Sequence, residues 1–350
     1  MAVLIHAAVL VLGAAVVFVT WQSIIVTIIL PRRTRNWIAA LGWIATYRVI
    51  VGAARRMTDP AARDRLLALL GPLNLVGLLF TWMALFALGF ACVIFGATDA
   101  SFTDALDLAG SSIFTLGFAT GKTGFSHFLM DVAAASGMIV VGLQIGYLPT
   151  IYSAYSQRES FVTLLTMRAA ENGFTTGATI LANHPLPRHA ALLAALFTSW
   201  EGCAAAIVES HTNYPWLVAF RSPRASESWV TSMLAILDAI AILDAAAPSA
   251  VGPEAEHCRF ACGAALDILS EFLRPRPVRD RANDVPLGRA EFVAALESLE
   301  GRIPFERDAE SAWEAFRAAR VAYEPFALDL AAFMLLPRGG WLRPVAEEAA

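Results

Sequence analysis

Three long apolar segments limit what this chain can fold into. They cover residues 3–30, 73–95 and 128–155, and few polar side chains interrupt them. About 20 apolar residues in a helix cross the hydrocarbon core of a bilayer, where only helices and closed barrels satisfy their backbone groups. The chain is 57% apolar and 16% charged, against about 45–50% and about 25% in soluble domains. We therefore expect an all-α membrane protein with three transmembrane helices.

The first apolar segment has to be distinguished from a signal peptide. A signal peptide combines a basic start with an apolar core of about 7–15 residues. No Arg or Lys precedes this segment, and the segment is much longer. We expect a retained transmembrane helix.

The charges between the segments predict the orientation. Cytoplasmic loops are enriched in Arg and Lys, which places residues 31–70 inside the cell and residues 97–127 outside. The prediction is a multi-pass protein of the cell membrane with an outside N-terminus and a cytoplasmic C-terminal domain. The inner segment carries Arg32, Arg33, Arg35, Arg48, Arg55, Arg56, Arg63 and Arg65, and the outer one carries Asp99, Asp104, Asp107 and Lys122.

Residues 36–57 are apolar but contain Arg48. A fourth transmembrane helix here would reverse the orientation of everything that follows. We expect an amphipathic helix that lies on the cytoplasmic membrane surface.

The loop between the second and third segments contains a short helix signal. Ser101 or Thr103 is a suitable N-cap, and Asp104 and Asp107 suit the first turn. A helix from about residue 103 to 114 is too short to cross the membrane. A short helix between two membrane spans is typical of a re-entrant loop, which is tolerated only inside protein or beside water.

The residues that follow this helix are Thr115, Leu116, Gly117, Phe118 and Ala119. With the flanking segments, they resemble the pore of the tetrameric potassium-channel family, in which an outer helix, pore helix, Thr-Val-Gly-Tyr-Gly filter and inner helix follow in this order. The chain looks like a bacterial member with an extra N-terminal span and a helical cytoplasmic tail. The resemblance covers residues 73–158 and implies a homo-tetramer whose filter carbonyls replace the hydration shell of permeant K⁺.

The resemblance also has implications for gating and selectivity. In this family the inner helix bends to open the pore, which makes Gly137, Gly142 and Gly146 candidate hinges. Ala119 stands where the family has a second glycine in a left-handed conformation. A β-carbon there costs about 1–2 kcal/mol, so both a potassium-selective pore and a non-selective cation pore remain open.

The second half of the chain has helical periodicity and regular charges. We expect an all-α cytoplasmic domain over residues 159–350, after an N-terminal region over 1–70 and a pore domain over 71–158. Helices are predicted at about 159–171, 187–210, 223–246, 254–273, 287–301 and 307–334.

This domain contains two groups of residues with possible chemistry. His257, Cys258 and Cys262 have a spacing that can place ligands on one metal, but we expect instead a buried thiol pair on the apolar face of the helix. Residues 209–211 contain nucleophile and base types, but sequence neighbours do not face each other as a catalytic triad requires. We expect no enzyme activity, no cofactor and no metal beyond the permeant cation.

These observations predict a passive cation channel with K⁺ and membrane lipids as partners. The net charge of −4 gives no indication of a nucleic-acid partner. The alternative is a membrane-anchored helical signalling or interaction protein with a vestigial pore loop.

Overall fold

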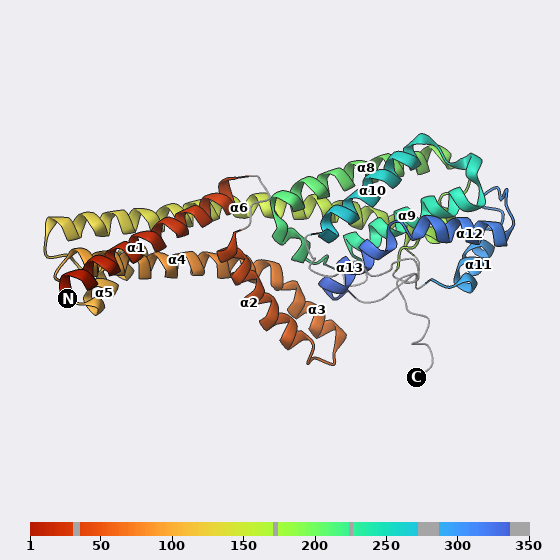
Figure 1. Cartoon of the computed structure of the whole chain (residues 1–350). Coiled ribbons are helices and arrows are strands. Elements are labelled where there is room, and N and C mark those ends of the chain that lie inside the picture. The colour runs from red at the N-terminus through yellow and green to blue at the C-terminus, as the bar shows by residue number, and fades with distance from the viewer. Residues whose placement is uncertain (31–35, 171–173, 224–226, 272–286, 337–350) are drawn as a thin grey trace. The chain divides into compact units, whose positions relative to one another are not determined.

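The computed structural model describes residues 1–30, 36–170, 174–223, 227–271 and 287–336 (Figure 1). Its regular elements in these ranges are all helices, as the apolar pattern predicts. The chain divides into two compact units, Met1–Tyr152 and Ser153–Ala350. Arg32, Arg33 and Arg35, which contribute to the predicted orientation, lie outside the described residues.

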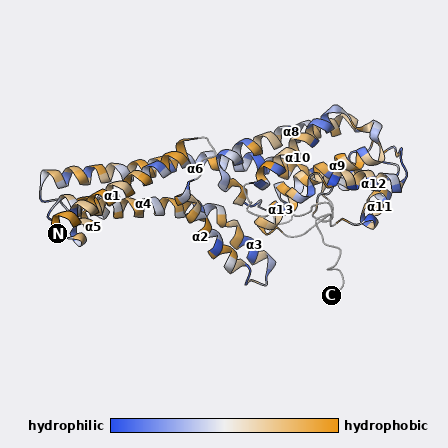
Figure 2. Ribbon diagram, in the orientation of Figure 1, coloured by the Kyte–Doolittle hydropathy of each residue, from blue (hydrophilic) through white to orange (hydrophobic). Residues whose placement is uncertain are grey.

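Helices long and apolar enough to cross a membrane are more numerous than the three predicted. In the described residues they are Val3–Ile29, Trp37–Ala54, Pro60–Ala97, Gly124–Ala169, Ala190–Asn213 and Trp229–Ala246. Figure 2 shows mostly apolar colouring along the first of these and along the Leu70–Ala97 part of the third, whereas the Pro60–Ala68 part includes hydrophilic residues. Length and composition alone do not separate a transmembrane helix from a helix that is buried inside protein.

The first unit is built on the pairing of α1 (Ala2–Ile24) with α4 (Leu70–Ala97). A π-helical turn, Ile25–Ile29, extends α1. A β-carbon on Gly13 would lie 2.6 Å from the carbonyl oxygen of Gly89, and one on Gly96 would lie 2.6 Å from that of His6. Glycines therefore let the two helix backbones approach closely, as in membrane helix pairs.

Two shorter helices follow α1, namely α2 (Trp37–Ala54) and α3 (Pro60–Ala68). The side chain of Asn36 caps α2 by accepting from the amides of Ile38 and Ala39. The same side chain donates to the carbonyl of Ser23, whose hydroxyl accepts from the buried indole of Trp82 at 2.9 Å. This network fixes the start of α2 to both α1 and α4.

The predicted loop helix is α5 (Phe102–Ile113), and it packs against α4. Ser101 is its N-cap, accepting from the amide of Asp104 at 3.2 Å. The next helix, α6 (Gly124–Ala169), is continuous through Pro149. The third apolar segment and the predicted helix at 159–171 are therefore one element, because Arg158 and Glu159 are compatible with an uninterrupted helix.

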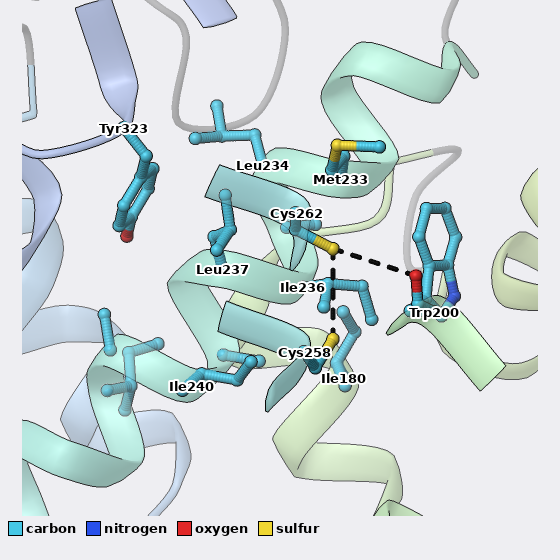
Figure 3. Packing of buried hydrophobic residues seen from close by; sticks show 14 of the residues in the cluster. Ile180, Trp200, Met233, Leu234, Ile236, Leu237, Ile240, Cys258, Cys262 and Tyr323 are labelled. Atoms are coloured by element: carbon cyan, nitrogen blue, oxygen red, sulfur yellow. Dashed lines mark hydrogen bonds between the residues drawn. The ribbon is translucent and has the colours of Figure 1, made fainter. Parts of the chain in front are cut away.

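The second unit contains the end of α6 and a cluster of further helices. Its centre is α9, which contacts α7, α8, α10, α12 and α13. Of the 18-residue apolar window of α9, 89% is buried within the protein, and Figure 3 shows its Ile236, Leu237 and Ile240 in this packing. The helices are α7 (Gly177–Asn183), α8 (Ala190–Asn213), α9 (Trp229–Ala246), α10 (Pro253–Glu271), α11 (Arg289–Ser298), α12 (Ala309–Arg320) and α13 (Glu324–Met334).

Two details of the second unit differ from the sequence prediction. The helix expected over 307–334 is two helices, because the chain turns at Val321–Tyr323 and Pro325, which has no amide hydrogen, lies in the first turn of α13. The short α7 was not predicted. It starts at a reciprocal cap between Thr176 and Thr179, a pair that lacks the Glu or Gln of the usual capping signature.

The glycine contact between α1 and α4 gives a test of this packing. We expect Gly13→Ala to destabilise the protein by about 1–3 kcal/mol, because the added methyl meets backbone atoms that cannot rotate away. Gly52→Ala in α2 is the control, since no atom lies within 4 Å of its β-carbon position. Thermal unfolding of both variants in detergent measures the difference. Equal melting temperatures would contradict the close helix contact.

Candidate functional site

The chain leaves α5 in an unusual backbone conformation. Thr115 and Gly117 have positive φ angles of 52° and 70°. Such angles are uncommon for residues other than glycine, so Thr115 is a strained position. Strain of this kind persists where the surrounding structure fixes it.

The fixing contacts come from two residues at the end of α5. The carbonyl oxygen of Ser112 accepts from the amide of Thr115 at 3.0 Å, and the other contacts come from Ser111. The carbonyl oxygen of Ser111 accepts from the amides of Leu116 at 2.8 Å and Gly117 at 3.4 Å. Its hydroxyl accepts from the amide of Ala119 at 3.1 Å. In a planar trans peptide, each carbonyl points opposite to the amide of the next residue. The carbonyl oxygens of Thr115, Leu116 and Phe118 therefore point away from α5.

Ala119 does not adopt the expected left-handed conformation. Among the described residues, the non-glycine residues with positive φ are Thr115 and Leu335. The amide of Ala119 is already directed to Ser111 by a hydrogen bond. The strain expected at Ala119 thus lies at Thr115, and the conformation of the last loop residue differs from the family expectation.

The side chains of the loop are open to their surroundings within one chain. Leu116 and Phe118 are each 64% exposed, and Thr115 and Gly117 are also exposed. A pair of large apolar side chains in this state indicates a surface that is covered in the functional assembly or by lipid.

The three candidate hinge glycines of α6 have different surroundings. A β-carbon on Gly137 would lie 2.3 Å from the carbonyl oxygen of Ile113, at the end of α5. No atom lies within 4 Å of the same position on Gly142 or Gly146. Gly137 is therefore the point at which the end of α5 packs closely against α6.

A second centre lies on the part of α6 that belongs to the second unit. Arg158 is 2% exposed and donates to the carbonyl oxygens of Leu217 at 3.1 Å and Phe220 at 2.7 Å. It also pairs with Glu159 at 2.8 Å and lies over the rings of Tyr155 and Trp229. One arginine thus attaches the end of α6 to the segment after α8. This role was not predicted from the sequence.

Arg158 also determines which ring nitrogen of His211 carries the proton. Arg158 can only donate, so the Nε2 atom of His211, 3.0 Å from Arg158 Nη1, accepts. The ring proton is then on Nδ1, 3.1 Å from the hydroxyl of Ser210, which itself donates to the carbonyl of Ala206. His211 in this tautomer has no free nitrogen to take a proton from Ser210. This pair is a structural contact and not a nucleophile with its base.

The cysteines of α10 are part of the core. Cys258 and Cys262 are fully buried, with their sulfur atoms 3.9 Å apart, and Cys262 contacts the carbonyl oxygen of Trp200 (Figure 3). The hydrogen bond with Cys258 and burial raise the pKa of the Cys262 thiol well above its usual value, so the reactive thiolate is disfavoured. His257 is exposed on the same helix and does not join the two sulfur atoms.

Comparison of the chain with protein-family models, with curated proteins and with solved structures gives no match.

The contact at Gly137 gives a prediction that distinguishes a packing role of this glycine from a role as a hinge in α6. We expect Gly137→Ala to lower the free energy of unfolding by about 1–3 kcal/mol, because the methyl group collides with the end of α5. Gly142→Ala and Gly146→Ala are matched controls in the same helix with open space at the β-carbon. Denaturant unfolding in detergent compares the three variants. The same loss in all three would show that the α5 contact is not the cause.

The Arg158 centre gives a second prediction. Arg158→Met leaves two buried carbonyl oxygens and the Glu159 carboxylate without their donor, and breaking a buried ion pair in this way costs about 3–5 kcal/mol. Arg168→Met is the control, because Arg168 is exposed on the same helix. Limited proteolysis of the full chain should cleave the 214–223 segment much faster in Arg158→Met only. Equal cleavage in both variants would contradict the anchoring role.

Proposed function

We propose that four copies of the chain form a passive cation channel, conducting potassium, with residues 115–119 as its selectivity filter. The observation that carries this proposal is the set of hydrogen bonds to Ser111, from which the outward direction of the carbonyl oxygens of Thr115, Leu116 and Phe118 follows. Rings of backbone carbonyl oxygens are the groups that replace the hydration shell of K⁺ in selective pores.

The proposed assembly contains several copies because each chain supplies one loop. A ring of carbonyl oxygens around an ion needs several such loops about a symmetry axis. The exposed side chains of Leu116 and Phe118 support this assembly, because neighbouring copies would cover them. The resemblance to tetrameric potassium channels is the reason for proposing four copies.

The orientation of α5 is favourable for a cation. Its C-terminal end immediately precedes the filter, and the helix dipole places partial negative charge at that end. Asp104 lies in the first turn at the opposite end, where the same dipole stabilises an acidic side chain. Cation binding at the filter then requires no charged side chain within residues 115–119.

In the membrane, α1, α4 and the first part of α6 are the three spans in this proposal, with the N-terminus outside and the second unit in the cytoplasm. We assign α8 and α9 to the cytoplasmic core, since α9 is almost completely surrounded by protein. We assign α2 to the inner membrane surface. A bend at Gly142 or Gly146 would gate the pore, because these glycines, unlike Gly137, are not occupied by a packing contact.

A flux assay tests the proposed pore. Potassium uptake into liposomes containing the purified protein should be abolished by Gly117→Asp, because Gly117 has a φ of 70° that a side chain strains and because the carboxylate would lie in the filter. Gly301→Asp is the matched control: this exposed glycine of the second unit has a φ of 71° and open space around it. Absence of uptake in the parent protein at all conditions would instead favour the signalling role.

Selectivity is tested through the residue that orients the filter. Ser111→Ala removes the acceptor of the Ala119 amide, and a lost hydrogen bond that leaves a donor unpaired costs about 1–3 kcal/mol. We expect a fall of about tenfold or more in the ratio of K⁺ to Na⁺ flux. Ser112→Ala is the control, since no described hydrogen bond joins its hydroxyl to the loop. An unchanged ratio in Ser111→Ala would contradict the role of Ser111.

A further inference from the structure

Glu324, the first residue of α13, is buried with more negative than positive charge around it. It is 0% exposed, as is Arg320 of α12, and the two are joined by an ion pair of 3.2 Å. The guanidinium of Arg320 is already engaged through Nε and Nη2 with both carboxylate oxygens of Asp238 in α9. Asp238 also accepts from the hydroxyl of Tyr323 at 2.7 Å.

The two carboxylates differ in their number of hydrogen-bond partners. Asp238 has three hydrogen bonds, whereas neither oxygen of Glu324 has a hydrogen-bond partner among the described residues. Two ionised carboxylates beside one guanidinium would leave a net negative charge inside the core, which is strongly unfavourable. Glu324 is the member of the cluster that should take up a proton.

The electrostatic surroundings agree with this geometry. Burial raises the pKa of Glu324, the charge of Arg320 lowers it and the charge of Asp238 raises it, which together place this pKa at about 7. Three helices pack around this point, with Arg320 on α12 and Asp238 on α9. α10 also packs against α13, and its described ionisable groups do not contribute to the shift.

The C-terminal end of α13 contacts Arg221, which lies in the segment that binds Arg158 of α6. The carbonyl oxygen of Met334, the last residue of α13, accepts from the guanidinium of Arg221. Arg221 directly follows Phe220, whose carbonyl oxygen accepts from Arg158 on α6. A continuous set of contacts inside the second unit therefore runs from Glu324 along α13 to the end of α6.

We propose that Glu324 is a proton switch of the second unit: with the proton bound, α13 stays docked against α9 and α10, and loss of the proton releases α13 together with its contact to Arg221. The switch itself concerns only this unit. Its effect on conduction rests on the proposed channel function, because it would act there through Arg158 and α6.

The direction of the pH dependence follows from the two states of Glu324. In the docked state the Glu324 carboxyl keeps its proton up to about pH 7. In the released state it has an ordinary pKa of 4.5 and loses the proton at a lower pH. Docking is therefore strongest below pH 4.5 and weakens as the pH rises, by up to about tenfold for each pH unit until pH 7. Above pH 7 neither state holds the proton, and the dependence ends.

Hydrogen exchange of the full chain in detergent tests the switch. Exchange of α13 amides, corrected for the intrinsic rate, should accelerate by about tenfold per pH unit between pH 5 and 7 and level off above. Glu324→Gln, which mimics the protonated side chain, should remove this dependence and keep exchange slow at every pH. Glu314→Gln, at an exposed site on α12, should behave as the parent protein does.

Two results would overturn the proposal. One is exchange of α13 that does not depend on pH in the parent protein, and the other is the same pH dependence in Glu324→Gln as in the parent. Potassium flux into liposomes is the second readout, and it should change with internal pH between 5 and 7 only where Glu324 is present. A pH-dependent α13 without any flux would support the switch and contradict the channel, so the two failures are distinguishable.

Discussion

The structure of the first unit depends on how the non-helical loop after α5 satisfies its backbone groups. Ser111 accepts from the amides of Leu116, Gly117 and Ala119, and Ser112 accepts from that of Thr115. This arrangement fixes the loop against α5, accompanies the left-handed angle of Thr115, and turns the carbonyl oxygens to the other side. The absence of a side chain at Gly137 lets α5 end directly on α6, so the loop and the long helix are held by one contact.

The same long helix reaches the second unit, and the contacts there are of a different kind. Arg158 is buried and provides donors for the carbonyl oxygens of the segment after α8. A buried guanidinium with several acceptors has one favourable position, which makes this attachment specific. Within this unit the contacts continue from Arg158 to the 214–223 segment and, through Arg221, to the end of α13.

The sequence predicted the elements whose signal is local. Apolar length identified α1, α4 and α6. Capping chemistry predicted Ser101 or Thr103 at the start of α5, and Ser101 is the N-cap. Interactions between positions distant in the sequence could not be predicted, because Arg158 meets Phe220 and Arg320 meets Asp238 only after folding. The apolar composition of α9 also does not distinguish a helix buried in a protein core from a transmembrane helix. The left-handed residue was expected at Ala119 and lies at Thr115, because Ser111 determines the path of the loop.

The central claim is that the carbonyl oxygens after α5 form a filter for K⁺, and the reversal potential tests it most directly. The purified protein would be reconstituted in planar bilayers with K⁺ on one side and Na⁺ on the other. We expect a reversal potential close to the K⁺ equilibrium potential, which would show that Ala119 is compatible with selectivity. A robust current that reverses near zero would contradict a potassium filter and indicate a non-selective cation pore.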